Sequence, residues 1–171
     1  MKRRAWLVGL ALGLGLGLVA CGGDETGTTP PTAEEAEKKA GELVGGTASG
    51  AEQVQEDGHS LWEMKVAMDN GATLTTYLFA DTLELFEIKD LDGPFDYDGL
   101  DPLPGMLTYS EARAIAFETQ AGTQRAWEVK YDDGPYFYEF YVIDSSEQLW
   151  EIKLWADTGE VFVTEPKSAI D

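Results

Sequence analysis

The second half of the chain carries the clearest alternation of hydrophobic and polar positions. Apolar and polar side chains alternate in three runs, which is typical of β-strands: 126–131, 136–143 and 149–155. The segments between the runs are made of Asp, Gly, Pro, Ser and Glu, and such residues favour turns. We therefore expect three antiparallel strands, with a short strand at 161–163 closing the set.

A helix is predicted directly before these strands, over residues 109–121. Thr108 and Glu111 have the Thr-x-x-Glu spacing of a capping box, in which each residue satisfies a free backbone N–H of the other. Apolar or small residues then recur every three or four positions, as on one side of a helix: Ala112, Ile115, Ala116 and Thr119. Gly122 is expected to end the helix in the left-handed conformation.

The first half repeats this order of elements at an offset of 76 residues, as between Thr32 and Thr108. The helix is expected over residues 33–44. Identical residues recur in one register without a gap: Gly46-Thr47 with Gly122-Thr123, Asp57-Gly58 with Asp133-Gly134, Glu63 with Glu139, Val66 with Val142, Leu78 with Leu154, and Ala80-Asp81-Thr82 with Ala156-Asp157-Thr158. So many identities at one offset indicate an internal duplication.

The alternation also assigns the two faces of the expected sheets. One face is apolar in both halves and should pack against the helix. The reverse face mixes charged residues with five aromatic side chains, which form a candidate binding surface: Phe137, Tyr141, Trp155, Tyr77 and Phe79. These aromatics could contact a partner, or they could pack the two halves together. The sequence leaves both alternatives open.

The N-terminus is typical of an export signal. Basic residues at 2–4 precede an apolar run at 6–20, which is shorter than the roughly 20 residues that span a membrane. The run ends in Leu-Val-Ala before Cys21, the only cysteine, and this resembles the lipobox of bacterial lipoproteins. We expect a lipid on Cys21 that holds the protein on the extracytoplasmic face of the cell membrane. Residues 22–31 lack hydrophobic side chains and read as a flexible tether.

The charge balance limits the classes of partner. The chain has 32 acidic and 12 basic residues, a net charge of −20, and no basic cluster, so nucleic acid is excluded as a partner. The acidic segment 87–107 contains five Asp residues among Gly and Pro. Its order does not match a calcium loop, and we expect an extended connector without a metal.

Catalytic chemistry is not indicated. His59 is the only histidine, it falls in an expected turn, and it has no cysteine nucleophile to activate. Zinc ligands and a glycine-rich phosphate loop are also lacking. We expect no catalytic residues, no cofactor and no enzyme activity.

The second half resembles the PepSY domain. The resemblance rests on Ser110-Glu111-Ala112 at the helix start, on Trp127-Glu128-Val129, on the 138–142 strand and on the closing segment 156–161. It covers residues 108–163 well and 32–86 less well, because Leu83 stands where the closing turn has Gly. It implies an α+β fold of two tandem units, each one helix packed on a three-stranded antiparallel sheet.

These expectations divide the chain into six parts: a signal peptide at 1–20, a lipidated tether at 21–31, PepSY-like units at 32–86 and 108–163, an acidic linker at 87–107 and a tail at 164–171. The resemblance implies a non-catalytic module that binds a protein or peptide, with an exported peptidase as the expected partner. The alternative is a structural or accessory envelope protein that buffers cations or docks to a membrane complex through its acidic surface.

Overall fold

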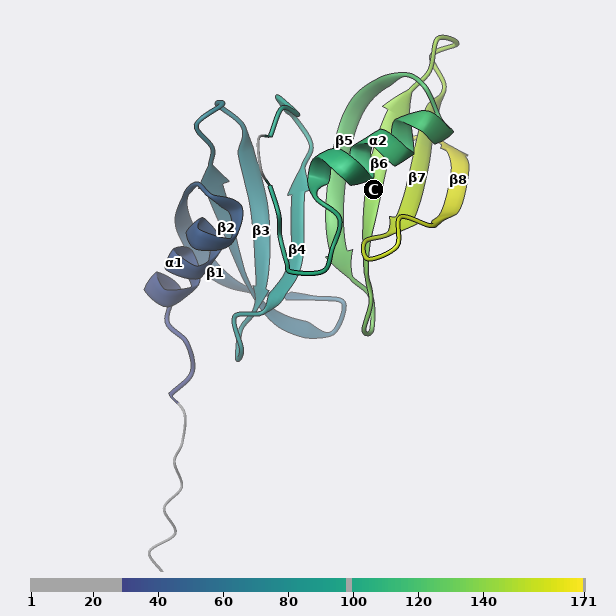
Figure 1. Ribbon diagram of the computed structural model, residues 1–171. Helices are drawn as coiled ribbons and strands as arrows, with labels where there is room; N and C mark the ends of the chain where they lie inside the picture. Colours follow the sequence, from purple (N-terminus) through teal and green to yellow (C-terminus); the bar gives the residue numbers. More distant parts are fainter. Residues whose placement is uncertain (1–28, 98–99, 171) are drawn as a thin grey trace, which may run out of the picture.

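The computed structural model describes residues 29–97 and 100–170. This part contains two helices and one antiparallel sheet of eight strands in sequence order (Figure 1). The elements are α1 (Ala33–Val44), β1 (Thr47–Glu56), β2 (His59–Ala67), β3 (Thr73–Phe79), β4 (Leu85–Asp90), α2 (Tyr109–Thr119), β5 (Thr123–Tyr131), β6 (Tyr136–Ile143), β7 (Leu149–Trp155) and β8 (Val161–Lys167).

The expected fold of two tandem units, each with one helix on a three-stranded sheet, is wrong. Each half contributes four strands, and β4 pairs with β5 so that one sheet runs through both halves. Glu87 lies opposite Lys130 in this pairing, and Lys89 lies opposite Glu128. The physical reason is that a strand at a sheet edge leaves backbone groups unpaired, and pairing β4 with β5 removes two such edges at once.

The strand count was wrong because β1 and β4 are hard to recognise from their side chains. β1 is an edge strand whose residues are exposed or only partly buried, so it lacks a clear alternation. β4 is buried on both faces and has no alternation for the opposite reason. The expected short strand at 161–163 is present as the start of β8.

The 76-residue offset reappears in the positions of the elements. The helices begin at Ala33 and Tyr109, and β3 and β7 begin at Thr73 and Leu149. The irregularity in the β3–β4 pairing after Tyr77 recurs in the β7–β8 pairing after Lys153. Both capping boxes are formed, at Thr32 and at Thr108.

Gly122 does not end α2 in the left-handed conformation. The helix ends at Thr119, with the extended residue Gln120 as its cap. Gly122 is required instead by close packing, because a Cβ there would lie 2.3 Å from the carbonyl oxygen of Ile143. Its counterpart Gly46 has the same role, since a Cβ there would lie 2.6 Å from the carbonyl oxygen of Ala67.

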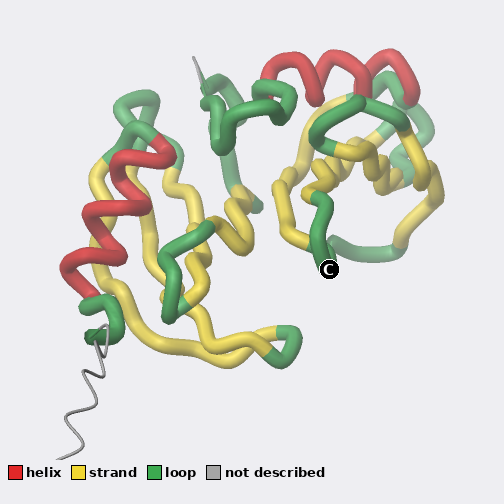
Figure 2. The backbone as a smooth tube through the Cα atoms, turned by 60° about the horizontal axis from the view of Figure 1, so that its bottom comes forward, coloured by secondary structure: helices red, strands yellow, loops and turns green. Residues whose placement is uncertain are grey.

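Both helices cover the same face of the sheet, α1 over β1–β3 and α2 over β6 and β7 (Figures 1 and 2). One hydrophobic core lies beneath them and continues across the β4–β5 pairing. Residues of the expected linker take part in it: Tyr97 and Leu100 are buried, and the Tyr97 ring packs 5.6 Å from Trp127. Tyr97 also donates a hydrogen bond to Asp90 at the end of β4. The connector is therefore packed on the core.

Candidate functional site

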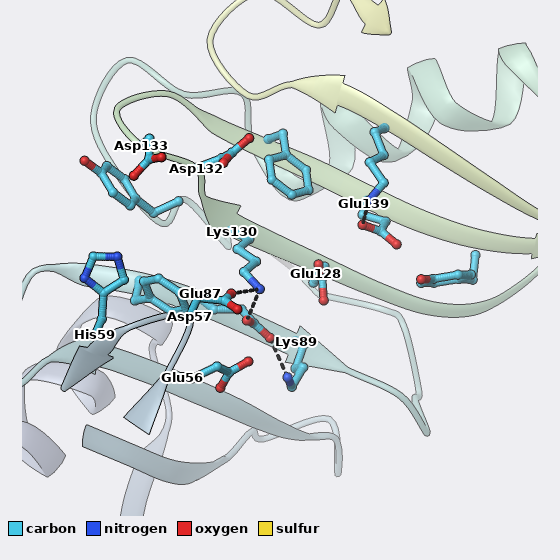
Figure 3. Close-up of a pocket in the computed structure, with 15 residues that line it drawn as sticks. Glu56, Asp57, His59, Glu87, Lys89, Glu128, Lys130, Asp132, Asp133 and Glu139 are labelled. Atoms are coloured by element: carbon cyan, nitrogen blue, oxygen red, sulfur yellow. Dashed lines mark ion pairs between the residues drawn. The ribbon is translucent and has the colours of Figure 1, made fainter. Parts of the chain in front are cut away.

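A groove of about 480 Å³ lies on the reverse face of the sheet, over the β4–β5 pairing (Figure 3). Successive side chains of a strand point to opposite faces of the sheet. Ile88 and Val129 point into the core under the helices, so the residues next to them in sequence point to the reverse face and line the groove. Both halves of the chain line it: Glu56, Asp57, His59, Phe86, Glu87 and Lys89 from the first, and Glu128, Lys130, Tyr131, Asp132, Asp133, Phe137, Glu139, Tyr141 and Lys153 from the second.

Lys130 ties the two halves together at the floor of this groove. Its Nζ atom lies 2.8 Å from the Asp57 carboxylate and 3.6 Å from the carboxylate of Glu87. Asp57 belongs to the turn of the β1–β2 hairpin, which extends behind the sheet toward β5 (Figure 1). Glu87 is 1 % exposed and also binds Lys89 at 2.7 Å, so this buried carboxylate has two cationic partners.

A second ion-pair network continues across β6, β7 and β8. Lys153 lies 2.7 Å from Glu139 and 3.4 Å from Glu151. Lys167 on β8 lies 3.2 Å from the same Glu151 carboxylate. All three lysines that line the groove, Lys89, Lys130 and Lys153, are thus paired with carboxylates of the chain itself.

The same lysines cover aromatic rings. The Nζ atom lies 4.8 Å from the centre of the Tyr77 ring for Lys89, 5.5 Å from that of Phe86 for Lys130, and 5.3 Å from that of Phe137 for Lys153. At these distances the ammonium charge is attracted by the ring face. The reverse face is therefore layered, with rings against the sheet and lysines above them.

The structure separates the five aromatics that the sequence predicted as a binding surface. Tyr77, Phe137 and Tyr141 are buried, and only Phe137 and Tyr141 line the groove. Phe79 is partly exposed and contacts Tyr131 of the other half, with ring centres 5.5 Å apart. Trp155 is partly exposed as well.

Trp155 belongs to an aromatic pair beside the groove. Its ring stacks on Phe162 with centres 4.2 Å apart and an angle of 19°. Phe162 is 41 % exposed, so the pair presents apolar surface to solvent. His59, expected in a turn, begins β2 and packs edge-on against Phe79 at 5.2 Å.

Glu128 occupies the middle of the groove and was missed at the sequence level. It lies between Lys89 on β4 and Glu139 on β6 in the strand register (Figure 3). Within residues 29–97 and 100–170, no Lys, Arg or His nitrogen lies within 4.0 Å of its carboxylate. Burial, together with the charges of Glu87 and Glu139, raises the pKa of Glu128 to about 8. Burial also raises the pKa of Glu139.

A signal for this site was present in the repeat. Glu128 and Glu139 are cross-strand partners, and so are Glu52 and Glu63, which stand at the same positions of the first half. β1 is a sheet edge, whereas β5 is covered on both sides by β4 and β6. The first-half pair is therefore exposed at Glu52 and partly exposed at Glu63, whereas the second-half pair is partly exposed at Glu128 and buried at Glu139, and only the sheet order reveals this difference.

Two further findings concern metals and membranes. In the described part of the chain, no three His, Cys, Asp or Glu side chains are grouped so that they could hold a metal ion. No helix in that part is long and apolar enough to cross a membrane. Cys21 and the expected signal peptide lie outside the described residues.

Comparison with known proteins finds a family match in the second half. Residues 106–162 match the model of a family described as "Peptidase propeptide and YPEB domain", abbreviated PepSY. A crystal structure of a "putative lipoprotein" from Clostridium difficile 630 aligns with 68% of this chain and 80% of its own, at 22% identity and a TM-score of 0.37. No curated protein matches the chain.

Proposed function

We propose that this chain is a non-catalytic module that binds an exported protein or peptide and restrains or assists a secreted peptidase, because residues 106–162 match the PepSY family model. The family match carries the proposal, since the family is described by its occurrence in peptidase propeptides. A propeptide acts by contact with its peptidase, so the chemistry required of the module is recognition. The groove and the exposed Trp155–Phe162 pair offer surfaces for such contact.

We further propose that residues 32–86 are a diverged second copy of the module. The elements of the two halves correspond at an offset of 76 residues, and both helices begin with a capping box. The division into residues 32–86 and 108–163 then describes two copies that share one sheet. A ligand in the groove would touch both copies, because each lines one side of it.

The module is proposed to act at the outer face of the cell membrane, held by a lipid on Cys21 and by the tether at 21–31. The basic start and the 15-residue apolar run support this location, since they fit a cleaved export signal. The described residues begin at Thr29, and α1 begins at Ala33, twelve residues after Cys21 in the sequence.

Cross-linking in living cells followed by mass spectrometry tests the proposed function. The full chain should be recovered with an exported peptidase or a secreted peptide. Trp155→Ala should reduce this recovery, because it removes the larger ring of the exposed aromatic pair. Lys38→Met, a change on the solvent-exposed side of α1, serves as the control. Recovery of no peptidase or peptide with the wild-type chain would contradict the proposal.

A further inference from the structure

The charges that line the groove do not balance within the chain. Seven carboxylates and three lysines line it, and each of the three lysines is already paired. Four of the carboxylates have no cationic group within 4.0 Å in the described part of the chain: Glu56, Glu128, Asp132 and Asp133. The groove therefore has an excess of negative charge that its own lysines do not neutralise.

Among these four carboxylates, Glu128 should gain the most free energy from contact with a cation. It lies at the centre of the sheet with Glu139 directly opposite, whereas Asp132 and Asp133 stand in an exposed turn. Glu128 is partly buried, and a partly buried charge that faces a like charge is unfavourable, so a cation in contact with it would relieve the repulsion. The raised pKa of Glu128 has the same origin, since burial and the charges of Glu87 and Glu139 all favour its neutral form.

The remaining lining suits the apolar part of a cationic side chain. Four rings lie beside the carboxylates: Tyr131 is partly exposed, whereas Phe86, Phe137 and Tyr141 are buried. A lysine or arginine side chain has an apolar stem and a charged end, and a guanidinium group can bind a carboxylate and lie against a ring at the same time. The chain already uses this arrangement three times, with Lys89, Lys130 and Lys153 each set over a ring and against a carboxylate.

We infer that the groove binds a basic side chain, arginine or lysine, of a peptide segment, and that Glu128 is the carboxylate that receives its charge. This inference rests on the proposed function and specifies the chemistry of the partner. The segment would lie between the β1–β2 turn and the β5–β6 turn, in contact with both halves. The partner is thus expected to present a basic residue on an extended or loop segment.

Calorimetric titration of the full chain, purified in mild detergent, tests the inference. The probe is a short glycine-rich peptide with one central arginine, and the comparison is the same peptide with citrulline, which is similar in shape but uncharged. The arginine peptide should bind at least about tenfold more tightly, as expected for a charged hydrogen bond. Its binding should also release a proton near pH 7, seen as a heat that changes with the ionisation enthalpy of the buffer, because Glu128 must become ionised.

The internal repeat supplies a matched control variant. Glu128→Gln and Glu52→Gln remove the same charge at corresponding positions, and both Glu52 and Glu128 face a glutamate. Glu128→Gln should weaken the arginine peptide about tenfold and abolish the proton release. Glu52→Gln should change the affinity less than twofold, because Glu52 lies outside the groove.

Equal affinity for the two peptides, or equal losses in the two variants, would overturn the inference. The proton release is measured on the wild-type chain, so it still tests whether Glu128 becomes ionised on binding if the Glu128→Gln variant does not fold. Cell cross-linking separates this inference from the proposed function. If the wild type and Glu128→Gln captured the same partner equally, the proposed function would be supported, but binding of a basic side chain by Glu128 in the groove would be rejected. Capture of no partner by the wild type would reject the function.

Discussion

At the scale of the residue, the most informative side chain is Glu128. Its counterpart Glu52 also lies opposite a glutamate on the next strand, but β1 is at the edge of the sheet and β5 is at its centre. The sequence therefore specifies a pair of glutamates, and position in the sheet decides whether their repulsion is screened by water. A carboxylate that is partly buried and has no ion-pair partner lowers the stability of the folded chain, and such groups are often found at binding sites.

The raised pKa of Glu128 should make the free energy of unfolding depend on pH. Its pKa in the folded chain, about 8, lies above the ordinary value of 4.5, so its stabilising contribution is complete below pH 4.5 and is lost as the pH rises through 8. Lys89 and Lys130, which favour its charged form, only partly offset the burial. Glu128→Gln should match the wild type in acid and be more stable by about 1–3 kcal/mol at pH 9. Urea unfolding at both pH values measures this.

The control for this measurement is again Glu52→Gln, which should follow the wild type within about 0.5 kcal/mol at both pH values because surface changes have small effects. A Glu128→Gln variant with no gain in stability at high pH would show that the carboxylate is well solvated or paired in the folded chain.

At the scale of the element, the β4–β5 pairing determines the architecture. It brings Glu87, a nearly fully buried carboxylate, between Lys89 on its own strand and Lys130 on the next. Removing one partner of a buried ion pair leaves an uncompensated charge, which costs far more than the pair itself contributes. The connector adds to the joint through Tyr97, which packs on Trp127 and donates a hydrogen bond to Asp90.

Double-mutant analysis should measure how strongly the ion pair between Glu87 and Lys89 stabilises this joint. Lys89→Met should lower the free energy of unfolding by about 2–4 kcal/mol, because Glu87 keeps only Lys130 at 3.6 Å. Glu87→Gln combined with Lys89→Met should recover part of that loss, since the buried charge is removed as well. Lys38→Met breaks the exposed Lys38–Glu42 pair and should cost less than about 0.5 kcal/mol. Equal costs for Lys38→Met and Lys89→Met in denaturant unfolding would refute the buried role of Glu87.

At the scale of the whole molecule, the two halves form one folding unit. The sheet and the hydrophobic core run without a break from β1 to β8, and Lys130 bridges to Asp57 of the first half. Tyr136 also donates a hydrogen bond of 2.5 Å to the carbonyl oxygen of Leu85 across the joint. Neither half is expected to keep its structure when the other unfolds.

Unfolding in urea should therefore be a single cooperative transition. Hydrogen exchange should give the slowest amides of β2 and of β6 the same free energy of opening, since both would exchange only through global unfolding. These strands lie in different halves, so the comparison is direct. A lower opening free energy for one strand by more than about 1 kcal/mol would mean that the halves unfold separately.

The proposed membrane anchor is testable at the same scale. Cells that produce the wild-type chain should incorporate labelled fatty acid into the protein and retain it in the membrane fraction. Cys21→Ser should abolish both, because the chain has no other thiol to accept the lipid. Labelling that survives in Cys21→Ser, or a wild-type chain without label, would reject the anchor.

The sequence by itself determined the features that depend on neighbouring residues. Capping boxes at Thr32 and Thr108 set the helix starts, alternation identified β5, β6 and β7, and the 76-residue offset predicted that the halves share an order of elements. The PepSY resemblance of the second half follows from local motifs too, and the family match confirms it.

Only the tertiary structure decided what depends on residues far apart in the chain. The pairing of β4 with β5, the packing of the connector on the core and the partial burial of Glu128 in the groove arise between segments that no local pattern relates. All strand edges present the same unpaired backbone N–H and C=O groups, so strands can pair in several ways. The free energy of the assembled core selects one of these pairings. The strand pattern therefore indicated β5, β6 and β7 but not β1 and β4, while the fold decided how the strands pair and which carboxylate lacks an ion-pair partner within 4.0 Å.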